Sequence, residues 1–225
     1  MTDLAILEDK IPAHLKKSEG RGNEGVGNSV VIPRIDLVYP SSKPIQEGWE
    51  GWKAGDFRHN LNDSRIPGEF LCINIWVACY WMVAPKWGAS VPDYRRYDFP
   101  TQKEALSHYD SIAEANRNNY ESFEEHAHML VLKDEDTGAL HDHPVMFHMN
   151  KSKTGVSKKW NSQLQSYGGD RFSNLWRVKS VPVVSKATSS TYPNIEIERI
   201  GWAIKEDFEK AEEIYKSYAG VSFDR

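Results

Sequence analysis

Cysteine is scarce in this chain of 225 residues, which contains only Cys72 and Cys79. They lie seven residues apart in one predicted strand, and an odd separation places two side chains on opposite faces of a strand. The thiols therefore cannot bridge each other within that strand, and we expect them to be buried and reduced, as in a cytosolic protein. Two cysteines also cannot supply a thiolate zinc site.

No segment is apolar enough for long enough to cross a membrane as a helix. The most apolar stretch, Phe70–Ala84, contains Asn74 and is shorter than the roughly 20 residues that such a helix needs. The N-terminal segment contains Asp3 and Glu8, whereas the start of a secretory signal would be basic. These absences predict a cytoplasmic protein with no membrane partner, located in the cytoplasm of a host cell if the protein is viral.

Common catalytic and nucleotide-binding signatures are absent as well. The chain contains no G-x-S-x-G, G-x-x-x-x-G-K-[ST], H-E-x-x-H or C-x-x-C motif. The sequence basis for a serine hydrolase, a P-loop nucleotidase or a zinc protease is therefore missing. We expect a protein that is not an enzyme and that carries no cofactor.

The net charge of −4 argues against an overall basic nucleic-acid binder, but the charges are segregated along the chain. Glu104–Asp136 contains nine acids and two bases, whereas Val145–Lys186 contains eight bases and one acid. This segregation indicates a basic face and an acidic face. We expect the acidic stretch to shield a basic groove or to contact a second subunit of a homodimer.

Aromatic residues are plentiful, with 8 tryptophans, 10 tyrosines and 8 phenylalanines, and many adjoin lysine or arginine. Proteins that bind single-stranded nucleic acid combine basic groups for phosphates with flat rings for bases. The candidate phosphate-binding residues are Lys151, Lys153, Lys158, Lys159, Arg171, Arg177, Lys179, Arg95 and Arg96. The candidate stacking rings are Trp52, Phe57, Tyr94 and Tyr97. Trp160 is expected in the core instead, because Val156, Trp160 and Leu164 recur at helical spacing.

The hydrophobic pattern predicts mainly strands with a few helices, an α+β fold. The strongest strand is Glu69–Val83, which is β-branched, aromatic and longer than most strands. Other strands are predicted at Val30–Val38, His126–Leu132, Ala139–Met149, Asn174–Lys186 and Tyr192–Ala203, and helices at Gln102–Asn119, Lys153–Tyr167 and Lys205–Tyr218. An OB-like antiparallel Greek-key barrel with inserted and C-terminal helices fits this order. Residues 1–29 are expected to form a flexible arm, and residues 30–225 a single domain.

Five histidines fall within 23 residues, on both strands of the predicted hairpin. A turn centred on Thr137 pairs His126 with His148 and leaves the two His-x-His pairs, at residues 126–128 and 141–143, without contact. A metal site would then need ligands from another element, so we expect no bound metal.

The order of these features resembles that of phage-encoded single-stranded DNA-binding proteins, the T7-like group in particular. The similar parts are the first strand VVIPRIDLVYP, the long second strand, the hairpin and the lysine-bearing helix SKTGVSKKWNSQL. The resemblance implies an OB fold and a protein that coats and protects single-stranded DNA in replication or recombination, with replication proteins as further partners. The T7-like proteins recruit such partners through an acidic C-terminal tail, whereas this chain ends GVSFDR.

Two other functions remain open. A virion or assembly protein would use the strands and aromatic loops for packing between proteins, and a metal-dependent enzyme would use the hairpin histidines. Salt-dependent binding of an oligonucleotide separates the first hypothesis from the assembly protein. The metal content of an untagged preparation tests the enzyme hypothesis.

Overall fold

The computed structural model describes residues 31–91, 94–185 and 189–218. Contacts between Cα atoms divide the chain into Met1–Val31 and Ile32–Arg225, and the fold below is that of the second unit. The arm expected at residues 1–29 lies outside the described residues. No helix in the described ranges has the length and hydropathy that a membrane crossing requires.

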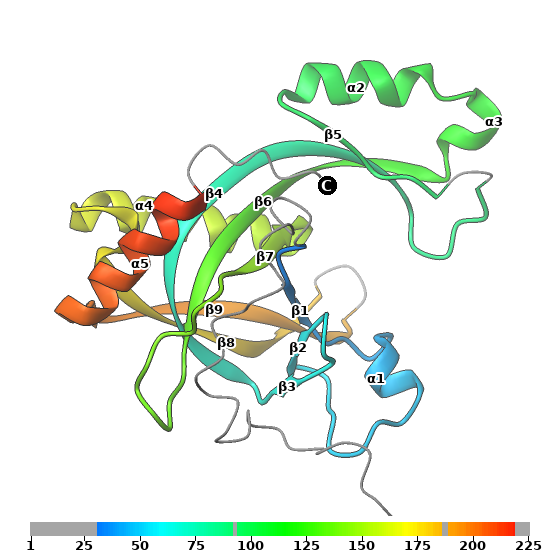
Figure 1. Ribbon diagram of the computed structural model, residues 1–225. Helices are drawn as coiled ribbons and strands as arrows, with labels where there is room; N and C mark the ends of the chain where they lie inside the picture. The colour runs from blue at the N-terminus through cyan, green and yellow to red at the C-terminus, as the bar shows by residue number, and fades with distance from the viewer. Residues whose placement is uncertain (1–30, 92–93, 186–188, 219–225) are drawn as a thin grey trace, which may run out of the picture. The chain divides into compact units, whose positions relative to one another are not determined.

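A nine-stranded sheet forms the body of the second unit (Figure 1). Eight strands follow the order β3-β2-β1-β7-β6-β4-β8-β9, and β5 pairs with β4 beside this path. The strands are β1 (Arg34–Leu37), β2 (Phe57–His59), β3 (Arg65–Ile66), β4 (Glu69–Pro85), β5 (Tyr97–Phe99), β6 (Tyr120–Lys133), β7 (Val145–Asn150), β8 (Asn174–Val184) and β9 (Thr191–Trp202). Each pairing is antiparallel except that of β1 with β7, which is parallel.

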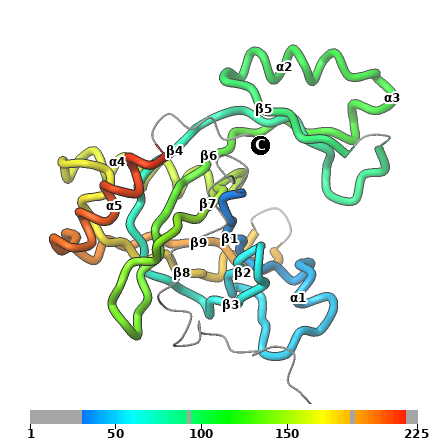
Figure 2. The backbone as a smooth tube through the Cα atoms, in the orientation of Figure 1, coloured from blue at the N-terminus to red at the C-terminus, as the bar shows by residue number. Residues whose placement is uncertain are grey.

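Strand β4 organises the sheet, and its prediction as a long antiparallel strand is confirmed. It pairs with β6 from Leu71 to Pro85, and its other edge pairs first with β8 and then with β5. The β4–β6 pair arches through the unit, as the backbone trace shows (Figure 2). Among the described residues, only the β6 edge of β4 is paired along most of its length, because β8 ends its pairing at Ile73 and β5 begins at Trp81.

In the described part of the chain, five α-helices accompany the sheet: α1 (Lys43–Gln46), α2 (Gln102–Ser111), α3 (Glu114–Arg117), α4 (Thr154–Tyr167) and α5 (Lys205–Tyr218), with the 3₁₀ turns η2 (Lys151–Lys153) and η3 (Arg171–Ser173). The last two α-helices lie close to their predicted ranges. The helix predicted at Gln102–Asn119 is divided, because Ile112 adopts an extended conformation between α2 and α3. Its start is as expected, since Thr101 and Glu104 form a reciprocal cap.

The sheet has an apolar core on each face. One core contains Trp160 and Leu164 of α4 together with Trp176 of β8. The other contains Ala211 and Ile214 of α5. Helices α4 and α5 therefore cover the sheet with their apolar sides and expose their polar sides.

The α+β class is confirmed, with strands dominating. Within the described residues, the hydrogen-bonded path of strands ends at β3 and at β9, so the sheet is curled but open, where a closed or nearly closed barrel was expected. The parallel β1–β7 pair also departs from the all-antiparallel order that was expected.

Candidate nucleic-acid interface

Helix α4 carries the lysines that were predicted to bind phosphate. Its apolar side consists of Trp160 and Leu164, which are buried, and Val156, which packs against the same core. The Trp160 ring stacks on His128 at 4.7 Å between centroids and meets Trp176 edge-on at 5.8 Å. The core role predicted for Trp160 is therefore confirmed, and the lysines of the helix face outward.

Buried hydrogen bonds join α4 to the sheet. The Ser157 hydroxyl of α4 lies 2.6 Å from Nδ1 of His126 and 2.7 Å from Nε2 of His128, both on β6. Nδ1 of His128 lies 2.9 Å from Nδ2 of Asn74 on β4. All four side chains are buried. The helix is thus fixed to two neighbouring strands by polar contacts in the interior.

This hydrogen-bonded chain has a cation at one end and an anion at the other. Arg171 donates from Nε to Oδ1 of Asn74 at 2.9 Å and from a terminal nitrogen to Asn161. At the other end, His126 donates from Nε2 to Oε1 of Glu124 at 3.0 Å. Because Nδ2 of Asn74 donates to Nδ1 of His128, the His128 ring carries its proton on Nε2 and donates it to the Ser157 hydroxyl.

The electrostatics of the interior agree with this assignment. Burial lowers the pKa of His128 well below its ordinary value, and the nearby Arg171 cation lowers it further. Burial also lowers the pKa of Arg171 to about 10, which still leaves the guanidinium charged at neutral pH. Burial alone would raise the pKa of Glu124, but hydrogen bonds from His126 and Lys158 lower it overall. Arg171 was predicted to contact phosphate. In the structure it donates hydrogen bonds to Asn74 and Asn161.

Two of the exposed lysines contact carboxylates of β6. Nζ of Lys151 lies 2.5 Å from Glu121, and Nζ of Lys158 lies 2.5 Å from Glu124. The lysine side chains are more than half exposed in both pairs. The acidic and basic stretches of the sequence therefore meet here, and the acids lie against the lysines.

The start of α4 has no acidic side chain and no side-chain cap in the described part of the chain. Lys153, at the end of η2, donates to the hydroxyl of Tyr39 at 3.0 Å. Lys159 is exposed and has no ion-pair partner among the described residues. The positive end of the helix and the lysines around it form a surface of the kind that binds phosphate.

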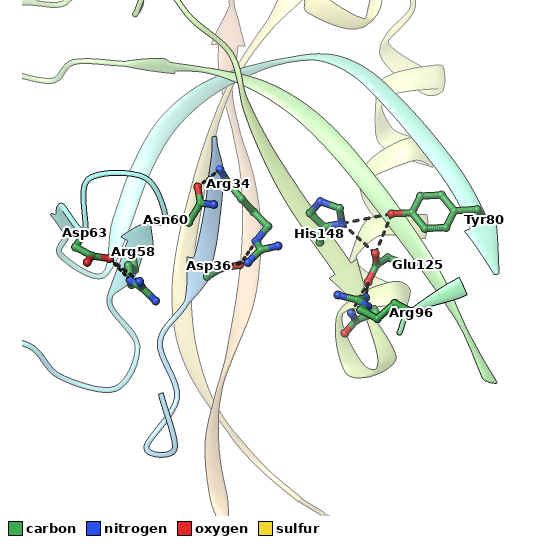
Figure 3. A network of polar contacts seen from close by, with 10 residues as sticks. Arg34, Asp36, Arg58, Asn60, Asp63, Tyr80, Arg96, Glu125 and His148 are labelled. Atoms are coloured by element: carbon green, nitrogen blue, oxygen red, sulfur yellow. Dashed lines mark hydrogen bonds and ion pairs between the residues drawn. The ribbon is translucent and has the colours of Figure 1, made fainter. Parts of the chain in front are cut away.

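Glu125 follows Glu124 in β6 and therefore projects to the opposite face of the sheet. It accepts four hydrogen bonds (Figure 3). Tyr80 and His148 donate to Oε1 at 2.8 and 3.0 Å, and Asn150 and Arg96 donate to Oε2 at 2.7 and 3.0 Å. Burial alone would raise the pKa of this carboxyl, but the contacts with His148, Asn150 and Arg96 hold it far below its ordinary value. Arg96 therefore anchors its segment to β6.

The remaining candidates of that segment differ in exposure. Tyr94 and Arg95 are exposed, whereas Tyr97 is half-buried and its ring lies 4.5 Å from that of His108. Because Arg96 binds Glu125, this segment reaches the same part of β6 as Lys158 does, but on the opposite face.

Arg177 and Lys179 lie on β8, where it pairs with the start of β4. Arg177 lies 3.6 Å from Glu69, and Lys179 lies 3.5 Å from Glu198. Glu124, by contrast, is opposite Trp81 near the other end of β4. These two basic residues are balanced by acids and belong to a different region from the lysines of α4.

Two aromatic candidates have different surroundings. Phe57 was expected to stack on a base, but it is fully buried and meets Phe70 edge-on at 5.0 Å and Phe147 at 6.1 Å. It is a core residue, because its side chain in β2 projects inward. Trp52 is half-buried and meets Trp49 edge-on at 5.7 Å.

The register of β6 and β7 differs by one residue from the expected one. His148 lies opposite Ala127, and His126 lies opposite Met149, so His126 and His148 project to opposite faces. Among the described residues, no group of three or more histidines, cysteines or acids is arranged to hold a metal ion.

Sequence reasoning missed Asn74 and Ser157 as residues that position α4. A signal was present, because Asn74 is the polar residue within the apolar stretch of β4 and Ser157 lies on the apolar side of its helix. A buried polar residue requires a hydrogen-bond partner. Here His128 is the common partner of Asn74 and Ser157.

The family described as Pam3 phage gp34-like protein matches residues 5–223 of the chain. Comparisons with curated proteins and with solved structures give no match.

Proposed function

The chain belongs to the Pam3 phage gp34-like family, and from this premise we propose that it binds single-stranded DNA during phage DNA replication or recombination. The phosphates bind at the lysines around the start of α4, and exposed aromatic side chains take the bases. Replication proteins and a second copy of the chain are the further partners in this proposal.

The observation that carries the proposal is the surface of α4. No acidic residue occurs between Lys151 and Gly169. No described side chain caps the start of α4, although the Thr154 amide donates to the carbonyl of Lys151 in the preceding η2 turn; Lys153 precedes the helix, and Lys158 and Lys159 lie in its second turn. Phosphates are favoured at such a helix end by the amides, by the helix dipole and by the lysine charges together.

The ion pairs with β6 are compatible with exchange for phosphate. Lys151 and Lys158 are more than half exposed in their pairs with Glu121 and Glu124. Exposed ion pairs contribute about 0.2–1 kcal/mol each. A DNA phosphate that replaces a carboxylate therefore breaks an ion pair that contributes little free energy.

The OB-like interpretation of the fold is part of this proposal. The arched β4–β6 pair supplies a curved antiparallel surface comparable with the strands of an OB barrel. The open path of strands and the parallel β1–β7 pair are the departures from that topology.

The test is titration of a fluorescently labelled dT oligomer with the protein at about 50 mM and about 200 mM salt. We expect affinity to fall steeply with salt. Replacing Lys158 and Lys159 by alanine should weaken binding on every sequence and flatten the slope of log K against log salt by about 0.7 for each lost contact.

The matched control removes two exposed lysines elsewhere, Lys103 of α2 and Lys205 of α5. This variant has the same net charge as the first but keeps Lys158 and Lys159, so its affinity should stay close to that of the wild type. Equal effects of the two double variants would exclude α4 as the phosphate site. No salt-dependent binding by the wild type would contradict the proposed function and favour an assembly role.

A further inference from the structure

A cation and two aromatic rings meet at the C-terminal end of α4. The Arg199 guanidinium of β9 lies 4.4 Å from the ring centroid of Tyr167, the last residue of α4, and 4.6 Å from that of Trp202, the last residue of β9. Oδ1 of Asn174 accepts a hydrogen bond from Nε of Arg199 at 2.7 Å, which fixes the guanidinium between strand and helix. We call Tyr167, Arg199 and Trp202 the ring–arginine stack.

Both rings of the stack are open to solvent. Trp202 is 58% exposed and Tyr167 is 43% exposed, although aromatic side chains of this size are usually buried. Neither ring is required to fill the core, because Trp160 and Trp176 do so beneath the helix. The exposed faces are flat, and the guanidinium adds a positive charge beside them.

The stack and the lysines lie at the two ends of one helix. Lys159, the lysine nearest to Tyr167 in α4, precedes it by eight residues, which is about 12 Å along the helix axis. The exposed residues between them, which include Ser162, Gln165 and Ser166, are uncharged. A strand of nucleic acid along α4 would therefore meet cations first, then neutral polar groups, and then an aromatic platform with its own cation, without meeting an acid of the helix.

We propose that the ring–arginine stack is a base-stacking site for the single strand whose phosphates bind at the start of α4. This inference rests on the proposed function and adds a specific set of residues to it. A base stacks on the exposed face of Trp202, and Arg199, held by Asn174, keeps that ring in place and attracts the adjacent phosphate. Stacking of this kind tolerates any sequence, because every base has a flat face.

The test compares Trp202→Ala, Trp202→Phe and Trp87→Ala by anisotropy of a labelled dT oligomer at the two salt concentrations. Trp87 is 83% exposed and follows the end of β4, so it is the matched loss of an exposed indole away from α4. Loss of one stacked base corresponds to a weakening of about 5- to 150-fold. We expect this loss for Trp202→Ala, with an unchanged salt slope, retention of most affinity in Trp202→Phe, and no change in Trp87→Ala.

The melting temperature should be nearly unchanged in Trp202→Ala, which separates a binding role from a structural one. If the wild type binds with the expected salt dependence and Trp202→Ala binds equally well, the stack is not the base site although the proposed function stands. If the wild type does not bind dT, both proposals fall. If Trp202→Ala changes the elution volume of the protein but not its DNA affinity, the stack is a contact between copies of the chain, and the inference is overturned.

Discussion

The hydroxyl of Ser157 lies 2.7 Å from Nε2 of His128, and this contact joins the helix of the lysines to the strand at the centre of the sheet. Both groups are buried and both depend on further partners. A shift of α4 by one residue would remove the Ser157 hydroxyl from both histidine rings and leave buried polar groups unsatisfied. Placement of the lysines is thereby fixed from the interior.

Replacing Ser157 by alanine should destabilise the fold. The change leaves Nδ1 of His126 and Nε2 of His128 without their partner, and each unsatisfied buried group costs about 1–3 kcal/mol. Urea unfolding monitored by circular dichroism measures the loss. Ser162→Ala is the matched control, because Ser162 is exposed on the same helix and donates only to a backbone carbonyl. Equal stabilities of the two variants would mean that the buried chain contributes nothing.

Stability should fall as the pH drops below about 6.5, owing to His128. Burial holds its folded pKa well below the ordinary histidine value of about 6.5, so on acidification the unfolded chain binds a proton that the folded chain cannot. The free energy of unfolding then decreases by up to about 1.4 kcal/mol per pH unit for this proton. Urea unfolding between about pH 5 and about pH 7 avoids most carboxylate titration.

The variant His128→Gln assigns that pH dependence. It removes the titrating ring, so its stability should change less with pH in this window, even if the protein is less stable throughout. His143→Gln is the control, because His143 is exposed. A pH dependence that persists in His128→Gln would point to another group.

The long elements could be predicted from a strong hydrophobic pattern, which is an almost continuous apolar run in the strand and a helical period in the helix. Strand β4 and helix α4 are the examples, and α4 also shows its buried side through Trp160. The bulge within β4 could not be predicted in this way. Ile75 is skipped in the pairing of β4 with β6, so Cys72 and Cys79, opposite Leu132 and His126, project to the same face despite their odd separation. Cys72 is buried as expected, but Cys79 is exposed.

The candidate site was predicted only in its outline. Runs of lysine show where charge is exposed, and the lysines of α4 are exposed as expected. Composition cannot show which ring is buried or which cation is engaged: Phe57 and Arg171 are adjacent to basic or aromatic residues like the other candidates, yet Phe57 is fully buried and the partly buried Arg171 donates to Asn74. Arg199 and Trp202 were missed because their partner Tyr167 is distant in sequence.

Replacing Trp160 by alanine should cost about 3–5 kcal/mol of stability, the usual range for a large aromatic residue removed from a core. Trp160 is fully buried between His128 and Trp176. Thermal unfolding checks the loss, and Trp87→Ala should leave the melting temperature almost unchanged. A DNA-binding defect in a Trp160→Ala protein of normal stability would contradict the core role.

Replacing Glu121 by glutamine should strengthen binding of dT oligomers if the acidic stretch shields the lysines. Glu121 lies 2.5 Å from Nζ of Lys151, and the glutamine keeps its size while removing the charge that competes with phosphate. Exposed ion pairs of this type contribute about 0.2–1 kcal/mol, which corresponds to a gain in affinity of about 1.5- to 5-fold.

Glu206→Gln makes the same change in net charge at the exposed start of α5, so any general effect of charge appears in both variants. A gain confined to Glu121→Gln, larger at low salt than at high salt, would place the competing phosphate at Lys151. Equal affinities of the two variants would mean that the contact with β6 only positions Lys151 and that the acids do not compete with phosphate for the lysines.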